Sequence, residues 1–128
     1  MSIRCLIVDD SARFANDARE LLEEEGINVL ALAADGEEAL RVARDVRPDL
    51  ALVDIDLGGE SGLDVARRLC DGEDGGLAGA VILVSTHTEE QFSELIAASP
   101  AVGFIAKSEL SADAIATLLR RGQRGRVD

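Results

Sequence analysis

Five short apolar segments rich in valine, isoleucine and leucine recur along the chain, without strict alternation of polar and apolar positions. Runs of this length and composition are typical of β-strands whose two faces are both buried. We therefore expect five interior strands, over residues 3–8, 27–33, 50–53, 80–84 and 102–106.

The segments between and after these strands carry apolar residues at a helical period. Each has one apolar stripe, as expected for a helix that packs on a sheet. The stripes are Phe14, Ala18, Leu21 and Leu22; Leu40, Ala43 and Val46; Leu63, Ala66 and Leu69; Phe92, Leu95 and Ile96; and Leu110, Ala114, Ile115, Leu118 and Leu119. Strands and helices that alternate with short connections predict a doubly wound α/β domain, with a parallel sheet and five helices on its two faces.

Local signals mark several element ends. Asp35, Ser61 and Thr88 each stand three residues before a side chain that can complete a capping box. These partners are Glu38, Asp64 and Gln91. Pro48 ends the second helix before the third strand. The glycine-rich stretch 71–79 precedes a strand rather than a helix, so it predicts a flexible connector and not a phosphate-binding loop.

Length, charge and cysteine content narrow the class of protein. The 128 residues match one domain, which we place at 1–121, followed by a flexible tail at 122–128. The formal net charge of -12 opposes direct nucleic-acid binding, which needs a basic surface. No signal peptide or membrane-spanning segment is predicted. Cys5 and Cys70 lack metal-ligand spacing and are expected to be reduced, which favours a cytoplasmic location.

Candidate chemistry lies at the carboxyl ends of the predicted strands, the edge at which open α/β sheets bind ligands. Asp9 and Asp10 follow the first strand and Asp54 the third. Ser85 follows the fourth strand and Lys107 the fifth. Crowded carboxylates repel one another, and a hard divalent cation with oxygen ligands, best Mg²⁺, would compensate. This arrangement predicts a metal-dependent phosphoryl-transfer site.

Lys107 stands out by composition, because it is the only lysine among 13 basic residues. A lysine offers a compact charge on a flexible stem and can meet one carboxylate or phosphoryl oxygen, whereas arginine favours planar, two-pronged contacts. A compact ammonium is therefore expected at this position, although a chance placement stays open.

Four segments resemble, in order and spacing, the receiver domains of two-component response regulators. They are VDD at 8–10, LVDIDLGGESG at 52–62, ILVST at 82–86 and GFIAK at 103–107. The resemblance covers nearly the whole chain and is of the single-domain, chemotaxis-regulator type. It implies a flavodoxin-like sheet with strand order 2-1-3-4-5.

The resemblance also implies roles for the acidic residues. Asp54 corresponds to the phospho-acceptor. Asp9, Asp10 and Asp54, with the backbone carbonyl of Asp56, correspond to the Mg²⁺ ligands, and Mn²⁺ is a possible substitute. A helix cap by Asp10 or Ser11 is an alternative that can coexist with metal binding.

Further residues match the switch of this family. Ser85 corresponds to its hydroxyl residue, Lys107 to its lysine, and Phe104 to the aromatic that swings inward, although a plain core role is open for Phe104. The side chains of Asp56 and His87 are expected to tune hydrolysis of the phosphoryl group. An exposed loop acid and a surface histidine are the simpler interpretations.

The resemblance implies a bacterial phosphoprotein that is a signalling switch and not an enzyme, apart from self-catalysed phosphoryl uptake and autodephosphorylation. Its expected partners are a sensor histidine kinase or phosphotransfer protein and an unknown downstream protein. A homodimer through the fourth helix, fifth strand and fifth helix is a further possibility. No direct nucleic-acid or membrane contact is expected.

Two departures from the family concern loops near the site. Gly58 and Ser108 stand where many members have proline, which puts the placement of Lys107 in doubt. We expect a trans Lys107–Ser108 bond, because a cis bond before a residue other than proline costs about 2.5 to 4 kcal/mol.

Two alternatives remain at the level of sequence. Asp54-Ile55-Asp56 also matches the acidic motif of haloacid-dehalogenase-type phosphatases, but Gly58 replaces their usual threonine or valine and the paired acids come first rather than last. A receiver-like interaction module that works without phosphorylation is the second. The presence of both Asp54 and Lys107 disfavours it.

Overall fold

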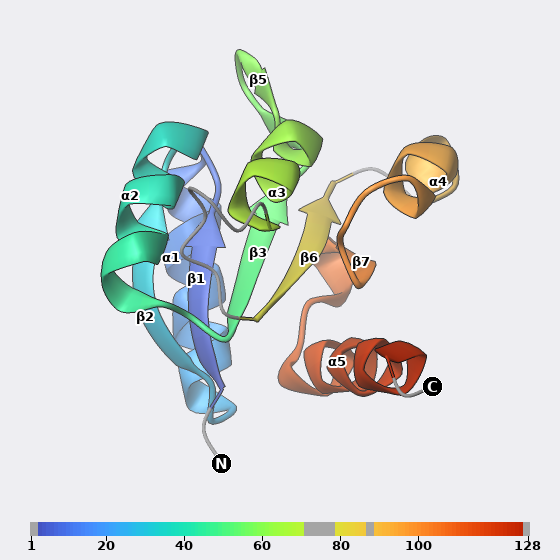
Figure 1. Ribbon diagram of the computed structural model, residues 1–128. Helices are drawn as coiled ribbons and strands as arrows, with labels where there is room; N and C mark the ends of the chain where they lie inside the picture. The colour runs from blue at the N-terminus through green and yellow to red at the C-terminus, as the bar shows by residue number, and fades with distance from the viewer. Residues whose placement is uncertain (1–2, 71–78, 87–88, 127–128) are drawn as a thin grey trace.

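A five-stranded parallel sheet forms the centre of the computed structural model, which describes residues 3–70, 79–86 and 89–126 (Figure 1). The strands are β1 (Arg4–Val8), β2 (Asn28–Ala33), β3 (Leu50–Asp54), β6 (Ala80–Ser85) and β7 (Gly103–Ala106). Their order in the sheet is β2-β1-β3-β6-β7. Counted along the chain as the five strands of this sheet, that is the predicted order 2-1-3-4-5, so the doubly wound, flavodoxin-like architecture is confirmed.

In the part of the chain that the structure describes, five α-helices cover the sheet, as the apolar stripes predict. They are α1 (Ala12–Glu24), α2 (Gly36–Val46), α3 (Gly62–Cys70), α4 (Glu89–Ala97) and α5 (Ala112–Arg126). A short 3-10 helix, Lys107–Glu109, follows β7. Helix α5 reaches Arg126, so a helix occupies most of the segment at 122–128 that was expected to be a tail. No described helix is long and apolar enough to cross a membrane.

Alternate residues of the strands feed two hydrophobic clusters, one on each face of the sheet. Leu6 and Val8 of β1 join α2 and α3 on one face, whereas Cys5 and Ile7 join α1 and α5 on the other. All four side chains are at most 1% exposed. The strands therefore bury both faces, which explains why they lack a polar alternation.

The capping predictions are partly correct. Asp35 caps α2 by accepting a hydrogen bond from the Glu38 N–H at 2.8 Å. The Glu38 carboxylate reaches back one residue further than predicted and accepts from Ala34 N at 2.7 Å. Ser61 accepts from Leu63 N at 3.2 Å rather than from residue 64. Helix α2 ends before Pro48, as predicted.

An unpredicted two-stranded hairpin stands at the upper edge of the sheet in Figure 1. It pairs β4 (Asp56–Leu57) with β5 (Glu60–Ser61) in antiparallel fashion. Gly58, in its turn, has a φ of 72°, a conformation that glycine adopts without steric cost. Residues 71–78 of the predicted connector at 71–79, and the cap at Thr88, lie outside the described residues.

Candidate functional site

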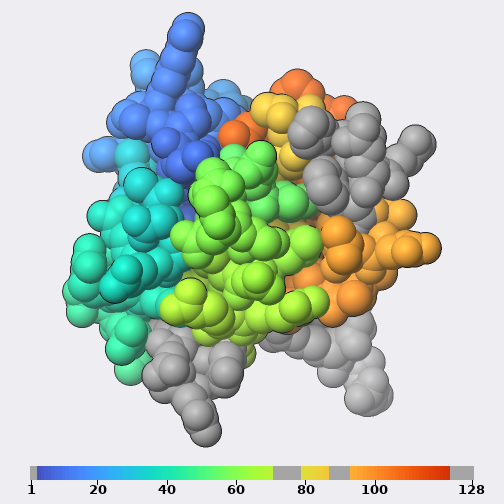
Figure 2. Space-filling view, turned by 90° about the horizontal axis from the view of Figure 1, so that it is seen from above, coloured from blue at the N-terminus to red at the C-terminus, as the bar shows by residue number. Residues whose placement is uncertain are grey.

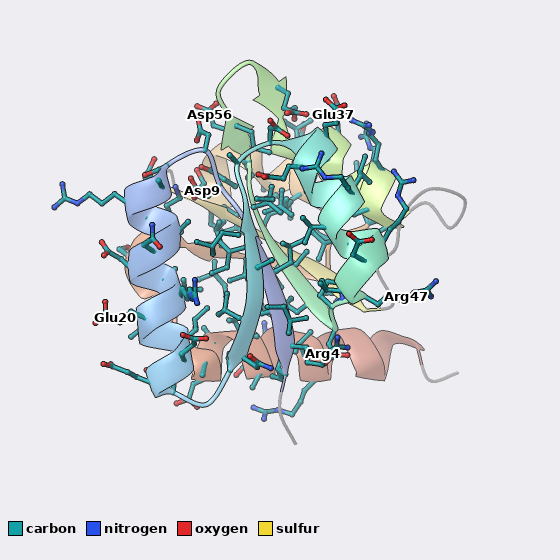
Figure 3. All side chains as sticks on the ribbon, turned by 90° about the vertical axis from the view of Figure 1, so that its left-hand side faces the viewer. Arg4, Asp9, Glu20, Glu37, Arg47 and Asp56 are labelled. Atoms are coloured by element: carbon teal, nitrogen blue, oxygen red, sulfur yellow. The ribbon has the colours of Figure 1, made fainter. Side chains whose placement is uncertain are left out.

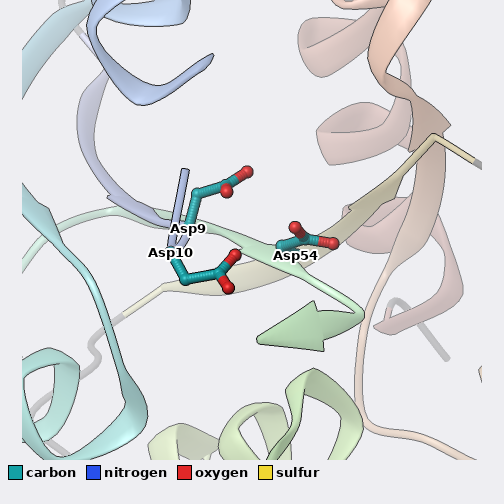
Figure 4. A group of neighbouring side chains, drawn as sticks. All are labelled: Asp9, Asp10 and Asp54. Atoms are coloured by element: carbon teal, nitrogen blue, oxygen red, sulfur yellow. The ribbon is translucent and has the colours of Figure 1, made fainter. Parts of the chain in front are cut away.

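Three carboxylates converge at the carboxyl end of the sheet. Asp9 and Asp10 follow β1 and Asp54 ends β3, and Figure 4 shows their side chains grouped together. One carboxylate oxygen from each residue lies within 4.8 Å of the others. Asp9 and Asp54 are buried and Asp10 is exposed. The sequence-based prediction of an acidic cluster at this edge matches the geometry, and one divalent cation could contact all three side chains.

Asp9 provides a test of whether the cluster fits a metal ion. Its Oδ1 accepts a hydrogen bond from Ser11 N at 2.8 Å. Its Oδ2 is buried and lies 2.8 Å from Lys107 Nζ in an ion pair, while no described residue donates a well-aligned hydrogen bond to it. One ammonium uses only part of the acceptor capacity of this buried oxygen, and acceptor capacity that is buried without a partner is costly. Mg²⁺ coordinates carboxylate oxygens, so the residues present fit this ion.

Lys107 reaches into the cluster from the end of β7. Its Nζ lies 2.8 Å from Asp9 Oδ2 and 3.0 Å from Asp54 Oδ2. It also lies 4.2 Å from the centroid of the Phe14 ring. Burial by itself lowers the pKa of Lys107, but the two carboxylates outweigh this effect and the pKa is raised. Lys107 therefore carries its charge at neutral pH.

Lys107 reaches the cluster although Ser108, and not proline, follows it. The described residues contain no cis peptide bond, so the Lys107–Ser108 bond is trans, as expected. The ammonium nevertheless contacts both buried carboxylates of the cluster. Placement of the lysine in this chain does not require a proline after it.

Asp54 is held in one orientation by two contacts. Its Oδ1 accepts a hydrogen bond from the backbone N–H of Asp56 at 3.0 Å, and its Oδ2 faces Lys107. Burial raises the pKa of Asp54, and the charge of Asp9 adds to this, while the contacts with Asp56 and Lys107 act in the opposite direction. Oδ2 is thus a fixed carboxylate oxygen beside a cation.

The hairpin after Asp54 is tied to a second segment of the chain. Glu60 Oε2 accepts a hydrogen bond from Gly36 N, in the first turn of α2, at 3.0 Å. Within the hairpin, Asp56 is exposed and its Oδ1 accepts from Gly58 N at 3.2 Å. Figure 3 shows Asp9 and Asp56 at the same end of the molecule. The loop beside Asp54 is therefore anchored at Glu60.

Gly62 brings the first turn of α3 against the end of β3. Its N–H donates to Ile55 O at 2.7 Å. A Cβ on this residue would lie 1.8 Å from the backbone oxygen of Asp54. Only glycine permits this approach, so the packing of α3 and the backbone position of Asp54 are linked.

The predicted switch residues lie on the two C-terminal strands. Ser85 is buried at the end of β6, opposite Ala106 of β7. Phe104 is half-buried on β7 and lines a groove of about 400 Å³ with Leu118 of α5. His87 lies outside the described residues. Figure 2 looks down on this edge of the molecule, where N-terminal (blue), central (green) and C-terminal (yellow to orange) segments meet.

Two contacts of the site involve residues that the sequence did not single out. Phe14 was predicted only as part of a core stripe, yet its ring contacts Lys107. The only feature of the sequence that pointed to this contact was the rarity of lysine and of aromatic residues. Glu60 anchors the hairpin to α2, and nothing in the sequence indicated that contact.

Comparison with known families identifies the class of protein. The model of the response regulator receiver domain matches residues 5–120. The chain belongs to this family, as its four motifs indicate. This membership disfavours the dehalogenase-type phosphatase alternative.

Individual relatives agree with this assignment. A candidate transcriptional regulator of Pseudomonas aeruginosa is 35% identical over 106 residues, which cover 83% of this chain and 50% of that protein. The DNA-binding response regulator MtrA of Mycobacterium tuberculosis is 44% identical over 69 residues, which cover 54% of this chain and 30% of MtrA. The chain spans half or less of the length of these relatives.

Solved structures of receiver domains share the fold over nearly the full length. The signal receiver domain of a modulated diguanylate cyclase from Desulfovibrio desulfuricans has a TM-score of 0.78 and 31% identity, covering 98% of this chain and 96% of that one. A LuxR-family two-component response regulator from Aurantimonas has a TM-score of 0.78 and 29% identity, covering 98% and 88%.

Proposed function

We propose that this receiver domain is a signalling switch in which Asp54 accepts a phosphoryl group in a Mg²⁺-dependent reaction. The observation that carries the proposal is the buried Asp54 carboxylate, placed between two further acids and the only lysine of the chain. Receiver domains of response regulators pass signals from histidine kinases to effectors, and membership in the family supports the same role for this chain.

The chain's own residues supply orientation and charge for the transfer. The Asp56 N–H holds Oδ1 of Asp54, which leaves Oδ2 to attack the phosphorus. The Oδ2–P bond forms as the bond from phosphorus to the donor nitrogen breaks, and the electron pair returns to that nitrogen. Lys107, 3.0 Å from Oδ2, can then contact a phosphoryl oxygen. When bound by Asp9, Asp10, Asp54 and the Asp56 carbonyl, Mg²⁺ would neutralise charge on the carboxylates and the phosphoryl group.

The phosphoryl group would act as a switch through charge. It adds roughly two negative charges and new acceptor oxygens, which attract the Ser85 hydroxyl and the Lys107 ammonium. Movement at Ser85 would be accompanied by a shift of Phe104, which lies on the adjacent strand. The surface formed by α4, β7 and α5 would change with it and bind a downstream protein or a second copy.

The proposed partners and setting follow from this role. A sensor histidine kinase or a phosphotransfer protein supplies the phosphoryl group in a bacterial cytoplasm. MtrA is a DNA-binding protein, but the matched part is less than a third of it, and the net charge of -12 opposes direct DNA contact by this chain. Apart from its own phosphorylation and dephosphorylation, the domain is proposed to catalyse no reaction.

Intact-mass spectrometry tests the proposal directly. The folded protein is incubated with acetyl phosphate and Mg²⁺, beside an Asp54→Asn variant and a sample with chelator. A mass increase of one phosphoryl group that needs both Mg²⁺ and Asp54 is the expected result. A folded protein that gains no phosphoryl group from acetyl phosphate or from a histidine phosphotransfer protein would instead favour a phosphorylation-independent module.

The tuning roles of Asp56 and His87 are tested by the decay of the adduct. The exposed Asp56 carboxylate stands two residues after the acceptor, and His87 two residues after Ser85. Asp56→Ala and His87→Ala are expected to change the rate of phosphoryl loss while uptake is retained. Unchanged decay in both variants would reject the tuning role.

A further inference from the structure

We propose that Phe14 is a positioning residue that holds the Lys107 ammonium against the carboxylate cluster. The Nζ atom lies 4.2 Å from the centroid of the Phe14 ring, within the range of a cation–π contact. The same atom lies 2.8 Å from Asp9 and 3.0 Å from Asp54. The use of this contact in phosphoryl uptake depends on the proposed function, whereas the contact itself does not.

The contact between Phe14 and Lys107 involves two residue types that are rare in this chain. The chain has one lysine, three phenylalanines, and no tryptophan or tyrosine. Its single lysine therefore contacts one of only three phenylalanine rings, which belongs to a residue far away in the sequence. Phe14 is half-buried on α1, where its ring packs against the cluster of α1 and α5.

A chain of hydrogen bonds fixes Phe14 relative to Asp9. The N–H of Ser11 donates to Asp9 Oδ1 at 2.8 Å, and the Ser11 hydroxyl, which caps α1, accepts from Phe14 N at 3.2 Å. The start of α1 thus holds one carboxylate partner and the aromatic partner of Lys107 in a defined relation. The lysine itself sits on a flexible stem and is followed by Ser108 rather than by proline.

The ring suits a position beside a lysine that must meet a phosphoryl group. Its face attracts the cation without adding another negative charge to a site that already has three carboxylates. It also occupies none of the three N–H donors of the ammonium in a strong hydrogen bond. These donors stay available for Asp9, Asp54 and a phosphoryl oxygen. A cation–π contact of this kind is worth a factor of roughly 2 to 30 in an equilibrium or a rate.

The contact can be tested by nuclear magnetic resonance on protein labelled only at lysine. Because the chain has a single lysine, such a sample gives one set of side-chain signals. The methylene protons next to Nζ are expected to be shifted upfield by the ring current in wild type, Phe14→Tyr and Phe14→Trp. In Phe14→Leu this shift should disappear. An unshifted lysine signal in the wild-type protein, or a shift retained in Phe14→Leu, would overturn the inference.

The consequence for phosphoryl uptake is tested with the same variants. Mg²⁺-dependent uptake from acetyl phosphate is expected to slow by roughly 2- to 30-fold in Phe14→Leu and to be preserved in Phe14→Tyr. Ile27→Val, which trims the same hydrophobic cluster away from the lysine, serves as the control and should keep the wild-type rate. Equal rates in Phe14→Leu and wild type, or a Phe14→Tyr variant as slow as Phe14→Leu, would refute the positioning role. If wild type takes up no phosphoryl group at all, the proposed function fails, and the lysine signal decides the contact alone.

Discussion

Replacement of Gly62 by alanine should both destabilise the fold and displace the backbone of Asp54, the proposed phospho-acceptor. The added Cβ would lie 1.8 Å from the backbone oxygen of Asp54, 2.7 Å from its carbonyl carbon and 2.8 Å from the Cα of Ile55. All three atoms belong to the backbone, so no side-chain rotation can relieve the clash. The start of α3 and the end of β3 must therefore move apart.

The expected cost follows from the size of this movement. Overpacking in a well-packed interior typically costs about 1 to 3 kcal/mol, and a clash with fixed backbone atoms belongs at the upper end of that range. Separation of the two elements would also weaken the 2.7 Å hydrogen bond from Gly62 N to Ile55 O, which is worth about 1 kcal/mol. We expect the free energy of unfolding to fall by about 3 kcal/mol or more.

Gly59→Ala is the matched control, because a Cβ at Gly59 would meet nothing within 4 Å and its φ is not positive. Its effect should stay within about 0.5 kcal/mol. Urea unfolding followed by far-ultraviolet circular dichroism is the assay, since the chain has no tryptophan or tyrosine for fluorescence. Phosphoryl uptake is then compared under conditions in which both variants are folded. A Gly62→Ala variant as stable as Gly59→Ala would refute the reasoning.

Three further predictions concern the metal, a helix cap and a buried thiol. Mg²⁺ at ten times its Kd should stabilise the fold by about 1.4 kcal/mol, or roughly 4 to 6 °C in Tm. This shift should shrink in Asp10→Asn, and an undiminished shift in that variant would exclude Asp10 as a ligand. Asp35→Ala should lose about 1 kcal/mol in urea unfolding, because the Glu38 N–H loses its cap; an unchanged unfolding midpoint would contradict this. Burial raises the pKa of Cys5 from 9.0 to about 12, so the folded protein keeps this thiol protonated while the unfolded chain ionises it. The protonated thiol therefore makes its full contribution to the free energy of unfolding below pH 9. Between pH 9 and 12 the free energy of unfolding should fall by up to about 1.4 kcal/mol per pH unit. In Cys5→Ala the free energy of unfolding should depend less on pH over this range. An unchanged pH dependence would mean that other groups cause it. A thiol reagent at neutral pH should modify exposed Cys70 rather than Cys5.

The strand ends of this protein could be predicted because a parallel sheet imposes a simple rule. All strands run in one direction, so the residues that follow them meet at one edge. The positions of Asp9, Asp54 and Lys107 at that edge follow from recognising the strands. Their contacts also need the long lysine side chain, because β7 lies two strands from β3 and three strands from β1 in the sheet. The apolar runs were long enough for this recognition.

The remaining contacts depend on packing that no local pattern encodes. The hairpin at 56–61 has strands of two residues each, which are too short to give a period. Leu21 belongs to the predicted apolar stripe of α1 but is 37% exposed, whereas the buried residues of this helix are Ala15, Ala18 and Leu22. The ring of Phe14 meets Lys107 only because α1 and the end of β7 come together in the fold. A helical stripe cannot show which of its members meets the site.

The contact between Glu60 and Gly36 makes the loop after β3 and the start of α2 a single unit for protein engineering. A Cβ at position 36 would lie 2.6 Å from Glu60 Oε1 and 2.7 Å from Cγ2 of the buried Val65, so a larger residue at position 36 would displace the Glu60 carboxylate. A chimaera that receives residues 56–61 or helix α2 from another receiver would replace only one of the two residues, Glu60 or Gly36, and could lose the contact between them. Loop grafts into this domain should therefore exchange position 36 together with position 60.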